Sequence, residues 1–232
     1  MIFYNGVSIS DVAPVQIEDI RVSGIQYNPV TRPRAVRFGS EFVRMGGGVR
    51  TVTLSFALLE RNAVLRQGWL RALSEWARTD AEYKMMLPTD PDRCLYCVCT
   101  SKPEPSTRAW YENKLKLVFT CVSNPYWTDT GETGAATGVQ FNIRGDAPPL
   151  MRIITTRQAA ASNQSYSDGT NTMTFTTIPA GDMVIDLNNQ TATVGGTSIM
   201  NYYTPSSRFI IPRQGFQTFT GDGTIRFRER WE

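Results

Sequence analysis

RTVTLSFAL, residues 50–58, alternates polar and apolar side chains along most of its length. Val52, Leu54 and Phe56 fall on one face of an extended chain, and hydroxyl side chains fall between them. This is the pattern of a strand that is buried on one side. KLKLVFTC, residues 114–121, repeats the pattern. The two segments therefore predict a β-sheet with one apolar face.

One stretch between these segments has the period of a helix. Its large apolar residues recur every three or four positions: Leu65, Trp69, Leu73 and Trp76. Asn62 stands where an N-cap belongs. We expect a helix over about residues 62–79 that covers one face of the sheet, with the apolar stripe as core packing.

Three of the four cysteines lie in RCLYCVC, residues 93–99. A zinc site needs four ligands on turns, but the chain has no histidine, and only the remote Cys121 could complete the set. No glycine interrupts the run, which is apolar on both faces. The segment is therefore interpreted as a buried strand whose cysteines act as small hydrophobes, with a metal site or a redox pair as the alternative.

The 232 residues, 41% of them hydrophobic, can form one large or two ordinary domains. TDTGETGAATG, residues 128–138, has no large apolar side chain and predicts a linker or a long exposed loop. Short strands separated by hairpin signals follow, which indicates a β-sandwich or small barrel. The signals are DGTN at 168–171, NN at 188–189, GG at 195–196 and GDG at 221–223. We expect domains at 1–130 and 131–232, with the partner of the last strand, TIRFRERW, left open.

Net charge is only +3, but arginines crowd one region. Six fall within thirty residues: Arg21, Arg32, Arg34, Arg37, Arg44 and Arg50. They could contact nucleic acid or the carboxylates of a partner subunit, and the lack of interleaved aromatic residues favours the subunit. MGGGVR, residues 45–50, lacks the GK[ST] ending of a phosphate loop and leads into a strand, so a hinge or a close backbone approach is expected.

Enzyme signatures in the sequence are thin. Paired carboxylates could still meet in the fold, but the candidates, such as Asp90 and Asp92 beside Pro91, have the pattern of turn residues. Without histidine, Ser-His-Asp and Cys-His arrangements and histidine-ligated metals are excluded. We expect no catalytic, cofactor or metal site. The tripeptide RGD, residues 144–146, is interpreted as a strand end and turn rather than an integrin motif. No apolar run approaches a membrane span and the start has no signal-peptide pattern, so folding in a reducing cytosol is expected.

The order of these features resembles one family of phage proteins. The resemblance rests on the opening FYNGVSI, the helix segment WLRAL, LPTDPDRCLYCV, LKLVFTCVSNPYW, AGDMVIDLNNQTATVGG and the terminal RERW. The sequence resembles the distal tail protein (Dit) family of long, flexible-tailed bacteriophages (siphoviruses) along nearly its whole length. The resemblance implies a mainly β protein, with an N-terminal ring-forming β-sandwich that carries one α-helix and a C-terminal galectin-like β-sandwich.

The resemblance also implies a structural role in the virion rather than catalysis. Members form homo-hexameric hubs that join the tail tube protein to tail-tip or baseplate proteins, and DNA passes through the central channel without specific binding. Their C-terminal domains face outward, where receptor-binding proteins or host polysaccharide could bind during adsorption. The family pattern places a subunit contact in a loop here, formed by Arg37, Phe42, Arg44, Gly46, Gly47 and Gly48. Assembly is expected in the cytoplasm of the host bacterium.

Two other functions fit the same sequence. A carbohydrate-binding module for cell-wall polysaccharide would need an aromatic platform, for which Tyr166, Tyr202 and Tyr203 are candidates. No tryptophan lies within residues 128–230, and the histidine that galectins use is missing. A tail tube subunit would share the ring and the β-rich composition, but it would stack into filaments.

Overall fold

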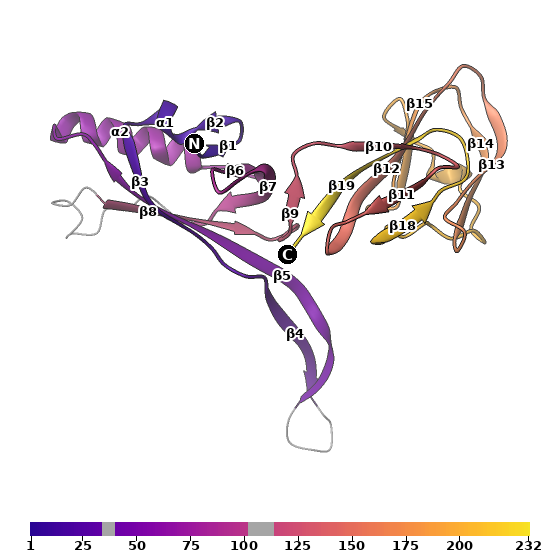
Figure 1. Cartoon of the computed structure of the whole chain (residues 1–232), viewed down its shortest axis with the longest axis horizontal. Helices are drawn as coiled ribbons and strands as arrows, with labels where there is room; N and C mark the ends of the chain where they lie inside the picture. Colours follow the sequence, from indigo (N-terminus) through magenta and orange to yellow (C-terminus); the bar gives the residue numbers. More distant parts are fainter. Residues whose placement is uncertain (34–39, 102–113) are drawn as a thin grey trace. The chain divides into compact units, whose positions relative to one another are not determined.

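The computed structural model describes residues 1–33, 40–101 and 114–232 (Figure 1). Most of this chain is β-strand, so the prediction of a mainly β protein is confirmed. The chain divides into a first unit, residues 1–127 together with Glu232, and a second unit, residues 128–231. Across the described ranges, no helix reaches the length and hydrophobicity that a membrane crossing needs.

The first unit is built on an antiparallel sheet with the strand order β3-β5-β8-β7-β6-β1-β2. Its strands are β1 (Phe3–Tyr4), β2 (Val7–Ser8), β3 (Val15–Val22), β5 (Ser40–Leu58), β6 (Tyr83–Leu87), β7 (Asp90–Cys99) and β8 (Lys114–Cys121). The two alternating segments lie side by side, with Val52 opposite Phe119 and Leu54 opposite Leu117. All four side chains are fully buried. The predicted apolar face is thus the core of this unit.

Helix α2 (Ala63–Ala77) confirms the predicted helix and its cap. The side chain of Asn62 accepts hydrogen bonds from the amides of Val64, at 2.9 Å, and Leu65. Leu73 and Ala77 are buried in the core, and Trp69 and Trp76 pack against it. The short helix α1 (Ile9–Val12) contacts α2.

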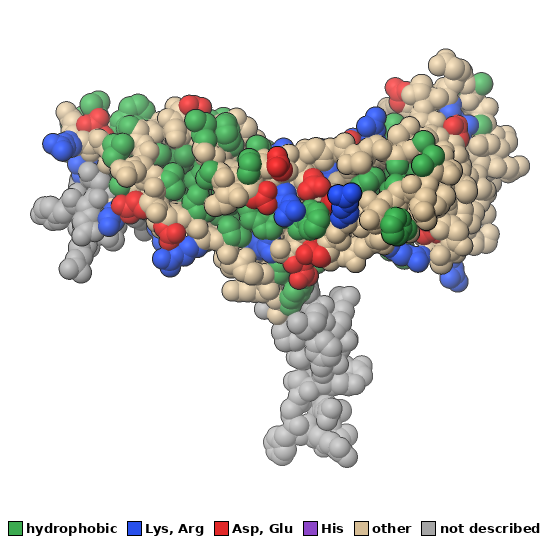
Figure 2. Space-filling view, viewed as in Figure 1, with side chains coloured by type: hydrophobic (Ala, Val, Ile, Leu, Met, Phe, Trp, Pro, Cys, Tyr) green, Lys and Arg blue, Asp and Glu red, His purple; other side chains and the backbone are tan. Residues whose placement is uncertain are grey.

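The first turns of α2 do not follow the prediction of a buried stripe. Leu65 is 53% exposed and Val64 is 79% exposed. Leu59 and Val7 are also exposed. Figure 2 shows hydrophobic side chains on the surface of this unit, over the region of α1 and α2. The helix therefore packs on the sheet through its second half, and apolar surface stays accessible at its start.

A two-stranded extension, called the arm below, leaves this sheet. Strand β4 (Gln26–Pro33) pairs with Ser40–Val49, the first half of β5. Pairing between β5 and β8 begins only at Arg50, so β4 and this part of β5 run on beyond the sheet as a ribbon (Figure 1). The strand β5 thus belongs to both the arm and the core sheet.

The second unit has two layers around one core. Its larger sheet has the order β10-β19-β12-β15-β16-β17, and the pairs β11–β18 and β13–β14 form the other layer. Buried residues of both layers meet in one cluster, as in a β-sandwich. The strands are β10 (Thr133–Ala136), β11 (Gln140–Ile143), β12 (Ala147–Arg157), β13 (Ala161–Ser167), β14 (Thr172–Ile178), β15 (Gly181–Asp186), β16 (Thr191–Val194), β17 (Thr197–Ser198), β18 (Gly215–Thr218) and β19 (Thr224–Trp231).

The predicted hairpins at 168–171, 188–189 and 195–196 are confirmed, because each joins two strands that pair. The hairpin predicted at 221–223 is wrong, since β18 pairs with β11 and β19 pairs with β10 and β12. The predicted linker is also wrong. Residues 128–138 include the end of β9 (Trp127–Asp129) and all of β10, which pairs with β19. A Cβ built at Gly134 would lie 3.0 Å from the Nη1 atom at the end of the exposed Arg226 side chain on β19. The last strand, β19, pairs with β12 on its other side.

Candidate assembly and binding sites

The residues of the predicted subunit contact lie on the arm, and the prediction that they form a loop is wrong. Phe42, Arg44, Gly46, Gly47 and Gly48 all belong to β5. The backbone register places Phe42 opposite Thr31, Arg44 opposite Val30 and Gly48 opposite Tyr27. Arg37 lies outside the described residues. The glycine run forms a strand because β4 offers its backbone a ladder of hydrogen bonds.

The pairing shifts register where the arm begins. One irregularity lies between Tyr27 and Pro29, opposite the glycine run, and a second follows Val30. Proline has no N–H to donate to the ladder, and glycine adopts the backbone angles that a bulge needs, so the sequence explains the irregularity at this point. Bulges increase local twist, which turns the arm relative to the strand that carries it.

Gly48 shows the close approach that the sequence predicted for the glycine run. A Cβ at this position would overlap the side chain of Ile25 and would lie 3.0 Å from Cε1 of Tyr27. Gly48 is buried between them. Any larger residue would therefore push the arm away from the segment that joins β3 to β4.

Both outer edges of the arm are open in the described part of the chain. There β4 pairs with β5 alone, and Ser40–Val49 pair with β4 alone. An isolated two-stranded ribbon is marginally stable in water, and an open strand edge is a template for pairing with another chain. The backbone of the arm is therefore suited to contact a second subunit.

The cysteine segment is the buried strand that the sequence predicted. Cys94 and Cys97 on β7 and Cys121 on β8 are fully buried, and all four cysteines are free thiols. Hydrogen bonding to Cys121, together with burial, raises the pKa of the Cys97 thiol. Burial also raises the pKa of Cys99. Thiolate, the reactive form, is thus disfavoured at both positions.

We expect the thiols of the folded protein to resist the reagent DTNB. Cys94, Cys97 and Cys121 should stay unmodified over an hour at pH 8, with only the partly exposed Cys99 reacting slowly, because the other three are out of reach of solvent. The measurement is absorbance of the released thionitrobenzoate. A sample in guanidinium chloride is the control and should react at all four thiols. Rapid reaction of two or more thiols in the native protein would contradict the buried-strand arrangement.

The RGD tripeptide lies between β11 and β12, at the strand end that the sequence predicted. The amide of Arg144 donates to the Oε1 atom of Glu229 at 2.7 Å. Gly145 is buried against β19, and a Cβ there would overlap the carbonyl oxygen of Arg230 and lie 2.9 Å from its nitrogen. The close packing of Gly145 on the backbone of Arg230 therefore explains why this position is a glycine.

The tyrosines proposed as a sugar platform are largely core residues. Tyr166 is 1% exposed and meets Phe175 edge to face, and Tyr203 packs on Phe175 and Phe209. Tyr202 is half-buried against the same core. The exposed aromatic ring of this unit is Phe216, 72% accessible, which sequence reasoning missed. The sequence does hold a signal for this exposed ring. Phe216 and Phe219 are three residues apart on an extended segment, so their side chains point to opposite faces and only one of them can face the core.

Comparison with known proteins identifies the fold. No protein-family model and no curated protein sequence matches the chain. Among solved structures, the chain has the fold of phage tail-hub and baseplate proteins. The Dit protein (gp 19.1) of phage SPP1, a paradigm of the hub adsorption apparatus in phages that infect Gram-positive bacteria, superposes with a TM-score of 0.76 at 16% identity, over 100% of this chain and 98% of that chain. A chain of the phage P2 baseplate in its activated, Ca-bound conformation superposes with a TM-score of 0.52 at 9% identity, over 94% and 90%. The predicted resemblance to Dit is confirmed at the level of the fold.

Proposed function

We propose that this chain is the distal hub of a phage tail, a structural protein and not an enzyme. The observation that carries the proposal is the match to SPP1 Dit, which runs through both units in order and leaves almost no residue of either chain unmatched. The proposed location is the tail tip of the virion, after assembly in the cytoplasm of the host bacterium.

We propose further that six copies close into a ring through their first units. The open edges of the arm support this, because a ring lets the arm of each copy pair with its neighbour. Apolar side chains exposed at the start of α2 support it as well, since exposed apolar surface favours association. In this arrangement the hub joins the tail tube protein to tail-tip and receptor-binding proteins, and DNA passes through the central hole.

Light scattering on the purified chain, with negative-stain images of the same fraction, tests the proposal. Six copies of the 26.0 kDa chain give a mass of about 156 kDa. Discrete rings of that mass are the expected result. Filaments of stacked rings would favour a tail tube subunit, and a monomer at every concentration would contradict the ring.

A further inference from the structure

The second unit carries a polar groove beside the turn that joins β13 to β14. It encloses about 610 Å³ between Ser167–Thr170 and the segment from Arg213 to Thr220. A second hollow of about 370 Å³ lies on the other side of the same turn and shares Thr170 with the first. Its walls are hydroxyl and amide side chains together with Arg208. A chain-like ligand could therefore lie across the turn and contact both hollows.

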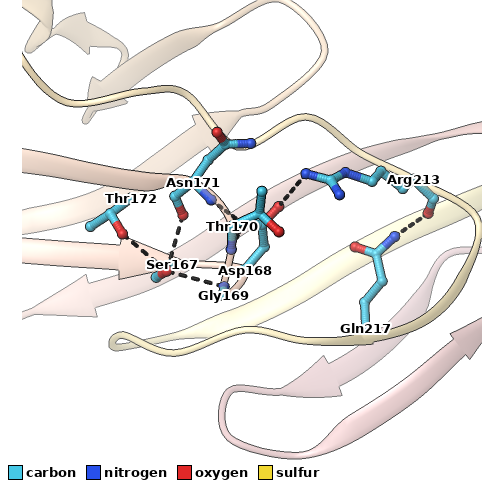
Figure 3. A network of polar contacts seen from close by, with 8 residues as sticks. All are labelled: Ser167, Asp168, Gly169, Thr170, Asn171, Thr172, Arg213 and Gln217. Carbon is cyan, nitrogen blue, oxygen red and sulfur yellow. Dashed lines mark hydrogen bonds and ion pairs between the residues drawn. The ribbon is translucent and has the colours of Figure 1, made fainter.

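Hydrogen bonds fix the turn that separates the two hollows (Figure 3). The Oδ1 atom of Asp168 accepts from the amides of Thr170 at 2.9 Å and Asn171 at 2.6 Å. The hydroxyl of Ser167 accepts from the amide of Gly169 and from the hydroxyl of Thr172, both at 3.1 Å. The groove is thus lined by a preorganised turn, which lowers the entropy cost of binding a ligand.

Arg213 supplies hydrogen-bond donors to the groove. Its Nη2 atom lies 3.5 Å from the Oδ2 atom of Asp168, whose side chain is 6% exposed, while the arginine side chain is 50% exposed. A guanidinium has five N–H donors, so an ion pair on one side leaves others for a ligand. The Gln217 side chain donates to the carbonyl of Arg213, which holds the backbone of this wall (Figure 3).

Phe216 adds one large apolar surface to a wall that is otherwise polar. Its ring is 72% exposed. Phe216 is the one large apolar side chain of the groove, whose other lining residues are Ser, Thr, Gln, Asp, Arg and Gly and add apolar surface only through their methyl, methylene and backbone carbons. A peptide anchored by apolar side chains would need more than one such surface. A nucleic acid strand would need a row of cations, and the two hollows together hold two arginines.

A saccharide matches this combination of groups. Its hydroxyls need many donors and acceptors, and its C–H face packs on one aromatic ring. We propose that the groove binds a saccharide chain, with Phe216 under a sugar ring and with Arg213 and the hydroxyls of the turn bonded to sugar hydroxyls. The groove lies wholly within the second unit, so the proposal does not depend on ring formation.

The test is binding of the full chain to an array printed with bacterial cell-wall and capsular polysaccharides. We expect the wild-type chain to bind at least one glycan, and Phe216→Ala and Arg213→Gln each to weaken that binding about tenfold. Phe216→Trp should retain binding, because it keeps an aromatic face. Val139→Ala, at a similarly exposed apolar side chain outside the groove, is the matched control and should bind like the wild type.

Three results would overturn the saccharide site. They are binding to no glycan on the array, binding that survives both Phe216→Ala and Arg213→Gln, and binding to anionic polymers alone that 0.5 M NaCl abolishes. The mass of each variant by light scattering distinguishes failure of the saccharide site from failure of the hub proposal. Loss of glycan binding with unchanged mass would contradict only the saccharide site. Loss of the ring with glycan binding intact would contradict only the hub proposal.

Discussion

Removing the arm should abolish the ring and leave a folded monomer. The variant replaces residues 28–47 with Asn-Gly, so that Tyr27 and Gly48, which face each other in the register, are joined by a two-residue turn. The core sheet keeps its pairing from Arg50 onward. Light scattering should then give the mass of a single chain at concentrations where the wild type forms the proposed ring, because the open strand edges have gone.

A single substitution tests the same contact more finely. Arg44→Glu reverses one charge on the arm and should shift the equilibrium from ring toward monomer by tenfold or more, as expected where an interfacial arginine meets a carboxylate. Arg226→Glu, at an exposed arginine of β19 in the second unit, is the control for net charge. Circular dichroism should show unchanged strand content in the two point variants, and in the arm-less chain a loss no larger than the deleted parts of β4 and β5. Intact rings from the arm-less chain would exclude the arm from the interface.

Gly145→Ala should destabilise the second unit by about 3 kcal/mol, although it adds only one methyl group. A change from glycine to alanine at a compatible site usually stabilises by about 0.4–1 kcal/mol through the unfolded chain. At Gly145 the new Cβ would overlap the backbone of Arg230, which cannot change rotamer to make room. The strand β19 must move, and its pairing with β12 is lost first near Ala147. Thermal unfolding followed by circular dichroism should show a midpoint lower by about 10 °C or more.

Gly131→Ala is the matched control for this prediction. No atom lies within 4 Å of a Cβ built at Gly131, and its backbone is outside the left-handed region. Its unfolding midpoint should stay within a degree or two of the wild type or rise slightly. An unchanged or higher midpoint for Gly145→Ala would show that β19 does not pass so close to the tripeptide.

The sequence predicts those elements whose signals are local. Strict alternation in residues 50–58 and 114–121 identifies two core strands, and Asn62 identifies the start of α2. Hairpins at 168–171 and 188–189 follow from asparagine, aspartate and glycine alone. These features depend on backbone preference and on burial of one face. Both can be predicted from the residues of a single segment.

Other elements depend on residues far along the chain, and sequence reasoning misses them. Strand β10 has no apolar alternation, and it is a strand because it pairs with β19, about ninety residues later. The glycine run is a strand only because β4 pairs with it. Tyr166 is buried because Phe175 packs on it. Its residue type suits a sugar platform, but its position places it in the core. The candidate groove combines two segments more than forty residues apart, which no local pattern shows.

The continuity of β5 has a mechanical consequence. One nineteen-residue strand runs from the arm into the core sheet, where it lies between β3 and β8. Load applied to the arm therefore passes along a covalent backbone, held by β3 and β8 on either side, directly into the most buried part of the first unit. If subunits of the proposed ring bind each other through this ribbon, separating them would load the hydrogen-bond ladders of β5 with β3 and β8 along their whole length.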